Sequence, residues 1–280
     1  MKDCFCLVLE GTFFKNIYLR EEMQMSKVPF LNTRIDNLTM AEALDHIDMM
    51  VGTRKPASVI PVNVDVITKI EKDNELRKIV DTADLVLADG KPLIWISKLL
   101  REPIKEKISG SDLVPKVCDR AAKRGYSVFL LGGEKQVAEE AGKRLERQFP
   151  GLRLKGVYSP PVGFEKDYAE LASIDRLISA AQPDILVICM GCPKQEKWMA
   201  EHFRSCGAIV SICAGATVDF LAGRKKRAPR WMSNCGLEWL YRFLQEPRRL
   251  FKRYFVDDLA IFKLIWKYRV SIGKKERYGG

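Results

Sequence analysis

The stretch Asp84-Leu85-Val86-Leu87-Ala88-Asp89-Gly90-Lys91-Pro92 decides how the fold is interpreted. Its apolar residues 85–88 predict a short buried strand, and the Gly-Lys-Pro that follows ends the strand before helical spacing begins. Asp89 therefore lies at the carboxyl end of a predicted strand, which is the ligand-binding edge of parallel α/β sheets. A carboxylate here has two interpretations. It caps the following helix, or it acts on a bound substrate.

Strand and helix patterns alternate on both sides of this junction. Thr39 and Glu42 form a capping box at the start of an N-terminal helix. Strands predicted at 126–131, 184–190 and 208–213 each end in glycine and are followed by a helix. Such repeating units predict an α/β fold, a Rossmann-like, doubly wound and mostly parallel sheet. The expected elements also include a strand from residue 57, a single helix over 66–79, and helices over 113–123 (with Ser111 or Asp112 as N-cap), 134–148 and 168–181.

The glycines at the strand ends have two interpretations. Gly132, Gly133 and Gly191 would let backbone N–H groups approach a phosphate, or they would only permit tight turns. Neither a GxGxxG fingerprint nor a Walker A sequence occurs. The sequence thus disfavours a dinucleotide-dependent dehydrogenase and a P-loop NTPase.

Composition predicts a globular intracellular protein. The chain has 280 residues, 47% of them hydrophobic, and no apolar run reaches the roughly 18 residues of a membrane span. Eight cysteines are scattered, and the Cys189–Cys192 pair has no second pair beside it, so we expect free structural thiols in a reducing cytoplasm rather than a zinc or redox site. No metal and no cofactor are expected.

The net charge of +11 is confined to the C-terminal fifth. Residues 224–280 hold 16 Lys and Arg against 5 Asp and Glu, whereas the rest of the chain is balanced. From residue 251 onward, aromatic and aliphatic residues recur at steps of three and four among basic ones, which is typical of helices in a bilayer interface. A solvated basic face on a core helix is the plain alternative. No nucleic-acid-binding signature accompanies the charge, so we expect an anionic membrane surface and no nucleic acid as partner.

Several longer motifs carry a resemblance. Gly191-Cys192-Pro193-Lys194-Gln195-Glu196-Lys197-Trp198 is followed by Gly236-Leu237-Glu238-Trp239-Leu240-Tyr241-Arg242 and then Glu246-Pro247, and Ser109-Gly110-Ser111-Asp112-Leu113 precedes them. In this order the motifs resemble the WecG/TagA/CpsF family of bacterial glycosyltransferases, over about residues 27–255. The resemblance implies transfer of a sugar from a UDP-sugar donor to a lipid-diphosphate-linked sugar acceptor, with inversion and without a metal. No Asp-x-Asp pair occurs in the chain.

The resemblance also implies roles for individual residues. Asp89 matches the proposed general base, and Lys107 falls where the family has an arginine, so it keeps the charge but not the bidentate fork. A solvated charge is the alternative for Lys107. Asn63 matches a Thr-Pro-Asn-like stretch, but the threonine is replaced by Pro61. The implied sets are catalytic Asp89 and Lys107; donor-binding Asn63, Gly90, Ser109, Gly110, Gly132, Gly133, Gly191, Pro193 and Gln195; and Arg227, Arg242, Arg249 and Lys252 for the acceptor diphosphate and the membrane.

Together these observations predict three regions: a poorly ordered extension over 1–26, an α/β catalytic domain over 27–223 and a basic helical membrane-binding appendage over 224–280. The predicted function is transfer of an N-acetylmannosamine-type sugar or its uronic acid to a polyprenyl-diphosphate-linked sugar for surface polysaccharide or teichoic acid, at the inner face of the plasma membrane. The alternative is a non-catalytic nucleotide-sugar binding module of the same fold. A homo-oligomer is compatible with either.

Overall fold

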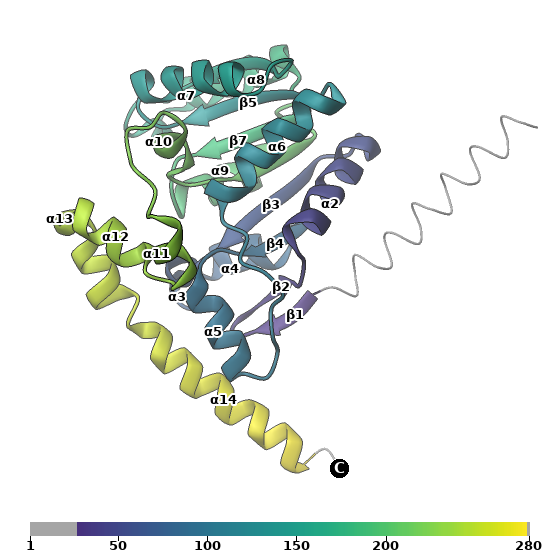
Figure 1. The fold of residues 1–280 in the computed structure, drawn as a ribbon. Coiled ribbons are helices and arrows are strands. Elements are labelled where there is room, and N and C mark those ends of the chain that lie inside the picture. The colour runs from purple at the N-terminus through teal and green to yellow at the C-terminus, as the bar shows by residue number, and fades with distance from the viewer. Residues whose placement is uncertain (1–26, 279–280) are drawn as a thin grey trace, which may run out of the picture.

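A six-stranded, all-parallel sheet forms the centre of the molecule (Figure 1). The structure is a computed structural model that describes residues 27–278, so the extension predicted over 1–26 lies outside the described residues. The strand order is β4-β3-β8-β7-β5-β6. The strands are β3 (Ala57–Val62), β4 (Leu85–Ala88), β5 (Ser127–Gly132), β6 (Arg153–Tyr158), β7 (Ile185–Cys189) and β8 (Val210–Cys213), and β1 (Lys27–Phe30) pairs antiparallel with β2 (Thr33–Asp36).

Side chains of the strands alternate between two hydrophobic clusters, one on each face of the sheet. In β3, Val59 joins one cluster and Ile60 the other, and β4, β5, β7 and β8 follow the same period of two. The first cluster is covered by α2 (Met40–Thr53), α6 (Gly110–Arg124), α7 (Lys135–Gln148) and α10 (Thr217–Leu221). The second is covered by α3 (Val64–Ile70), α4 (Asn74–Asp81), α5 (Lys91–Leu99), α8 (Tyr168–Ala181) and α9 (Lys194–His202).

The predicted doubly wound α/β fold is therefore confirmed, and it contains a topological switch point. Strands β3 and β8 are neighbours, yet α3 follows the first onto one face and α10 follows the second onto the other. Their connections diverge, which leaves a crevice at the carboxyl edge of the sheet. The fold thus fixes where a ligand would bind before any side chain is considered.

Local signals located most helices and misplaced two boundaries. The capping box of Thr39 and Glu42 begins α2 as predicted. The single helix predicted over 66–79 is wrong, because Asp73 accepts a hydrogen bond from the Leu76 N–H and starts the separate helix α4. Helix α6 begins earlier than predicted, since Ser109 is its N-cap.

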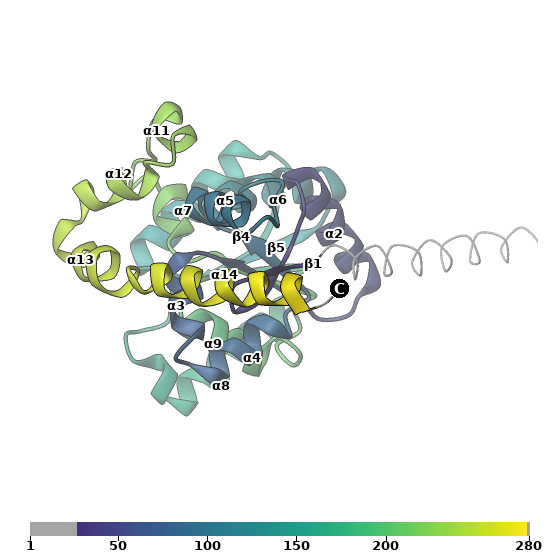
Figure 2. The ribbon, with the colours of Figure 1, turned by 90° about the horizontal axis from the view of Figure 1, so that it is seen from below.

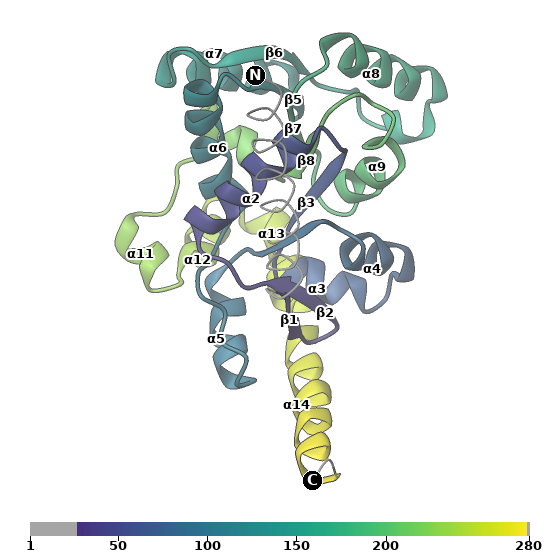
Figure 3. The same cartoon turned by 90° about the vertical axis from the view of Figure 1, so that its right-hand side faces the viewer.

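The C-terminal region wraps across the carboxyl edge of the sheet (Figures 2 and 3). It comprises α11 (Arg230–Asn234), α12 (Glu238–Gln245), α13 (Pro247–Lys252), the π-helical turn η2 (Arg253–Asp257) and α14 (Ala260–Tyr278). Ile261 and Leu264 bury the first half of α14 in the second cluster, and Lys267 Nζ donates to Glu71 Oε1 at 2.7 Å. Within residues 27–278, no helix has the length and apolar content needed to cross a membrane.

Candidate active site

A cavity of about 380 Å³ occupies the crevice between β3 and β8. The loops after β3, β4, β7 and β8 form one wall, and α12, α13 and η2 form the opposite one. We call this space the central cavity. Of the residues predicted as functional, it brings together Asn63, Asp89, Gly110, Gly191, Gln195, Arg242 and Arg249.

Asp89 lies on the wall of the central cavity directly after β4. Its backbone N–H donates to the Val62 carbonyl at 2.8 Å, which extends the sheet by one residue. The capping interpretation is wrong, because Gly90 is the N-cap of α5 and no side chain caps that helix. Within the described chain no protein group hydrogen-bonds the Asp89 carboxylate, which leaves its oxygens free to meet a substrate.

Burial raises the pKa of Asp89 above its usual value. The positive charges of Arg242 and Lys107 oppose this shift, and the negative charges of Glu238 and Asp112 add to it. A carboxyl group whose pKa is raised is better suited to exchange a proton than one held in an ion pair.

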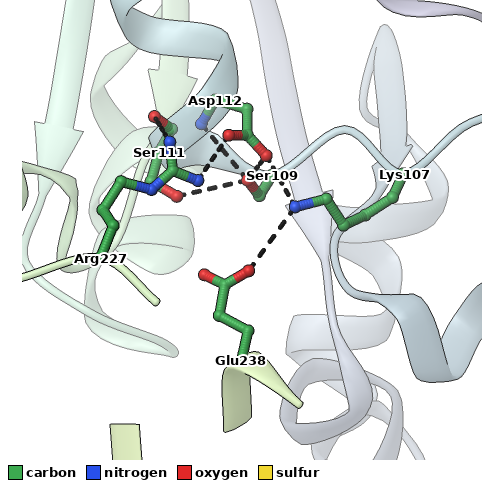
Figure 4. A network of polar contacts seen from close by, with 6 residues as sticks. All are labelled: Lys107, Ser109, Ser111, Asp112, Arg227 and Glu238. Carbon is green, nitrogen blue, oxygen red and sulfur yellow. Dashed lines mark hydrogen bonds and ion pairs between the residues drawn. The ribbon is translucent and has the colours of Figure 1, made fainter. Parts of the chain in front are cut away.

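Lys107 stands behind this wall in a network of charges (Figure 4). Its Nζ lies 2.7 Å from Asp112 Oδ2 and 3.6 Å from Glu238 Oε2. Arg227 also pairs with Asp112, and Ser109 Oγ donates to Asp112 Oδ2 at 2.6 Å. This charge network, formed by residues 107, 109, 112, 227 and 238, joins the start of α6 to the C-terminal region.

The alternative of a solvated charge at Lys107 is wrong, since only 14% of its side chain is exposed. Burial works against its charge, but the hydrogen bond and charge of Asp112 raise the pKa of Lys107 overall. Burial alone would raise the pKa of Asp112, but the hydrogen bonds from Lys107 and Ser109 outweigh this effect and lower its pKa to about 2. Lys107 therefore stays cationic and acts on Asp89 through its charge, rather than lining the central cavity.

Gln195 lines the central cavity and forms hydrogen bonds there, near the ends of β7 and β8. Its Oε1 accepts from the Gly215 N–H at 3.0 Å, and its Nε2 donates to Glu196 Oε1 at 2.7 Å. Glu196 is fully buried, its Oε2 has no partner in the described chain, and burial raises its pKa. The sequence analysis quoted Glu196 within the 191–198 motif but assigned it no role, because its polar neighbours gave no sign that it is buried.

Other predicted donor-binding residues shape the edges of the site. Asn63 lines the central cavity and caps α3, with its side chain accepting from the Val66 N–H at 3.2 Å. Ser109 and Pro193 are the N-caps of α6 and α9, the latter after a cis peptide bond with Cys192. Neither of these two caps lines the central cavity.

The strand-end glycines separate into two groups. A Cβ at Gly132 would lie 2.5 Å from the Cys189 carbonyl oxygen, and one at Gly133 would lie 2.7 Å from Val218. Close packing thus explains both, and they line a neighbouring cavity of about 520 Å³ rather than the central one. Gly191 lines both cavities, and a Cβ there would meet nothing within 4 Å. Gly215, after β8, also lines the central cavity with nothing within 4 Å of an added Cβ, so Gly191 and Gly215 both leave open backbone there.

The C-terminal region contributes most of the positive charge. Arg242 and Arg249 line the central cavity, whereas Arg227 is held in the charge network and Lys252 is exposed. Arg253, which the sequence analysis missed, also lines the cavity, and its buried Nε has no partner in the described chain. Its Nη2 pairs with Asp65 Oδ2 at 3.6 Å, so the guanidinium group is only partly satisfied, and the buried Nε remains available to an anionic ligand. The basic run from 248 to 253 was the available signal.

A second cavity of about 380 Å³ adjoins the central one, and most of its surface is apolar, although charged side chains such as Asp65, Lys91 and Asp258 also line it. We call it the apolar groove. Gly90 lies there, together with Trp239, Tyr254 and Phe255, whose rings pack edge to face at centroid distances of 5.9 and 6.4 Å from Trp239. No cluster of three or more His, Cys, Asp or Glu side chains that could hold a metal ion occurs among the described residues.

Residues 28–275 match the Glycosyl transferase WecG/TagA/CpsF family. The chain is similar to N-acetylglucosaminyldiphosphoundecaprenol N-acetyl-beta-D-mannosaminyltransferases: it is 31% identical to that of Bacillus spizizenii over 70% of this chain and 74% of the relative. It is 27% identical to that of Bacillus subtilis (89% and 90%) and 25% identical to that of Staphylococcus aureus (92% and 97%). The chain therefore belongs to the WecG/TagA/CpsF family of glycosyltransferases.

Proposed function

We propose that this chain transfers a sugar of the N-acetylmannosamine type, or its uronic acid, from a UDP-sugar to a polyprenyl-diphosphate-linked sugar. The observation that carries the proposal is the unpaired Asp89 carboxylate, which lines one cavity at the switch point together with Arg242 and Arg253. The names of the relatives support this substrate class, since each combines an amino-sugar donor group with a diphosphoundecaprenol acceptor.

In the proposed step, Asp89 takes the proton from the acceptor hydroxyl while that oxygen bonds to the anomeric carbon of the donor. The bond from this carbon to the UDP oxygen breaks on the opposite side, so the configuration inverts. A positioned base contributes roughly 10²- to 10⁴-fold to such a rate. The charge that develops on the departing diphosphate is stabilised by the guanidinium groups of Arg242 and Arg249, which need no metal to do so.

We further propose that residues 27–223 form the catalytic domain and that residues 224–280 attach it to the inner face of the plasma membrane. Exposed basic side chains such as Lys252 and Lys263, beside the exposed Phe262 and Trp266, support this proposal. Each basic group near an anionic bilayer is worth about 1 kcal/mol, so the attachment is reversible. Lys252→Glu with Lys263→Glu should weaken co-sedimentation with anionic vesicles and leave neutral vesicles unaffected. Equal sedimentation with the wild type would contradict it.

The catalytic proposal is tested by UDP release with candidate UDP-sugars and a lipid-diphosphate acceptor. Asp89→Asn should lower kcat by at least about 100-fold while the UDP-sugar still stabilises the protein against heat. Asp119→Asn, which changes an exposed carboxylate of α6, is the matched control and should keep full activity. Undiminished turnover by Asp89→Asn would remove Asp89 as the base. Donor binding by the wild type without turnover would instead support the non-catalytic alternative.

A further inference from the structure

The apolar groove opens directly from the central cavity. Asp89, Arg242 and Arg253 line both spaces, so a ligand at the catalytic carboxylate reaches the groove without leaving the protein surface. The groove then runs between the start of α5, at Pro92, and the start of α14, at Phe262. It is therefore a continuation of the reaction site and not a separate pocket.

The chemistry changes along this path. Near Asp89 the walls are charged, and the buried Arg253 Nε has no hydrogen-bond partner in the described chain. Farther out, the lining consists of the aromatic rings of Trp239 and Phe255 together with Leu259 and Phe262. A molecule that satisfies both parts carries a sugar, then an anionic group, then a hydrocarbon chain.

We propose that the apolar groove binds the first isoprene units of the acceptor, with its diphosphate at Arg253 and its sugar hydroxyl at Asp89. The inference rests on the proposed function and adds to it a specific lipid-binding site. Exposed large apolar side chains continue outward along α14, with Phe262 at 66% and Trp266 at 75% exposure. The rest of the lipid chain can therefore pass from the groove into the bilayer along α14, without exposure to water.

The test uses soluble acceptors in the absence of membranes and detergent: N-acetylglucosamine diphosphates that carry one, two, three or four isoprene units, below their micellar concentration. For the wild type, KM for the acceptor should fall as units are added, by at least about tenfold overall, because burying two methylene equivalents already corresponds to that factor. Leu259→Asn with Phe262→Ser should abolish this dependence on length and leave KM for the UDP-sugar unchanged. Both side chains are about half exposed or more, so the substitutions spare the core.

Trp266→Ser is the matched control, since Trp266 is an exposed aromatic residue on the same helix that does not line the groove. It should weaken binding to vesicles but retain the length dependence with soluble acceptors. Turnover by the wild type with a KM independent of chain length, or equal loss of the dependence in both variants, would overturn the groove alone. Absence of turnover with every acceptor would overturn the proposed function as well. Light scattering that showed the groove variant losing a dimer, with acceptor KM unchanged, would identify the groove as a self-interface and also overturn the inference.

Discussion

Asp112→Asn tests how strongly the charge network joins the C-terminal region to the catalytic domain. Asp112 accepts from Lys107 and Ser109 and pairs with Arg227, and its side chain is 24% exposed. Its pKa is lowered from 3.8 to about 2 in the folded protein. A difference of about 1.8 units at 1.36 kcal/mol per unit gives about 2 kcal/mol of stability at pH 7. The Asp112→Asn variant should be less stable than the wild type by this amount, which lowers its melting temperature by roughly 5 °C in a chain of this size.

The sign of the pH dependence follows from the direction of the shift. Because the pKa of Asp112 is lower in the folded state, its contribution is complete above about pH 5 and falls as the carboxylate becomes protonated. From the two pKa values, about half of it remains at pH 3. The difference in unfolding free energy between the wild type and Asp112→Asn should therefore shrink between pH 5 and pH 3.

Urea unfolding at pH 7, 5 and 3, followed by circular dichroism, measures this difference. Asp119→Asn on the same helix is the control, because Asp119 forms an exposed pair with Lys123 and should cost no more than about 0.5 kcal/mol. Equal losses in the two variants at pH 7, or a deficit of Asp112→Asn that does not change between pH 5 and 3, would refute the reasoning.

Three further predictions concern the cavity and the sheet. Burial raises the pKa of Asp89 and the positive charge of Lys107 lowers it, so kcat should fall as the base becomes protonated at low pH. Lys107→Met should move this limb of the pH–rate profile to higher pH, and an unmoved limb would contradict the coupling. Glu196→Gln keeps the hydrogen bond from Gln195 and removes a carboxyl group whose pKa is raised by burial, so the melting temperature of this variant above pH 7 should equal or exceed that of the wild type. Glu196→Ala should instead lower the free energy of unfolding by about 2 kcal/mol or more. Gly132→Ala should lower the free energy of unfolding in urea by about 2 kcal/mol or more, since the added Cβ meets a carbonyl oxygen at 2.5 Å. In the control Gly52→Ala, inside α2, the Cβ meets nothing, so this variant should be slightly more stable. Equal unfolding free energies of the two variants would argue against the packing role of Gly132.

The architecture was predictable from sequence because it depends on local and periodic signals. Four buried residues at 85–88 followed by glycine placed Asp89 at a strand end, and the structure confirms that position. The single helix over 66–79 failed because Asp73 was not recognised as an N-cap inside an otherwise continuous apolar period. A single capping side chain can start a new helix where a weak apolar periodicity alone would predict one continuous helix, and tertiary packing decides which of the two forms.

The candidate site was harder to predict because its members come from distant parts of the chain. Gln195 and Asp89 were singled out by motif and position, and both line the central cavity, whereas Arg253 and Glu196 stand out through buried atoms without a partner in the described chain. Lys107 was assigned a direct role, but its Nζ lies 2.7 Å from Asp112 Oδ2, and the residue does not line the central cavity. Its second partner, Glu238, lies 131 positions further along the chain, so no sequence pattern reveals that ion pair.

The pairing of β3 with β8 has a consequence for how the protein is made. Ala57 pairs with Val210, so the middle of the sheet cannot close until the ribosome has released most of the chain. Until then β3 and β4 present one unpaired flank of apolar residues, and parallel pairing across such distances is slow. We therefore expect β3, which borders the central cavity, to be the strand most dependent on protection from aggregation during synthesis. We also expect the central cavity to form among the last events of folding.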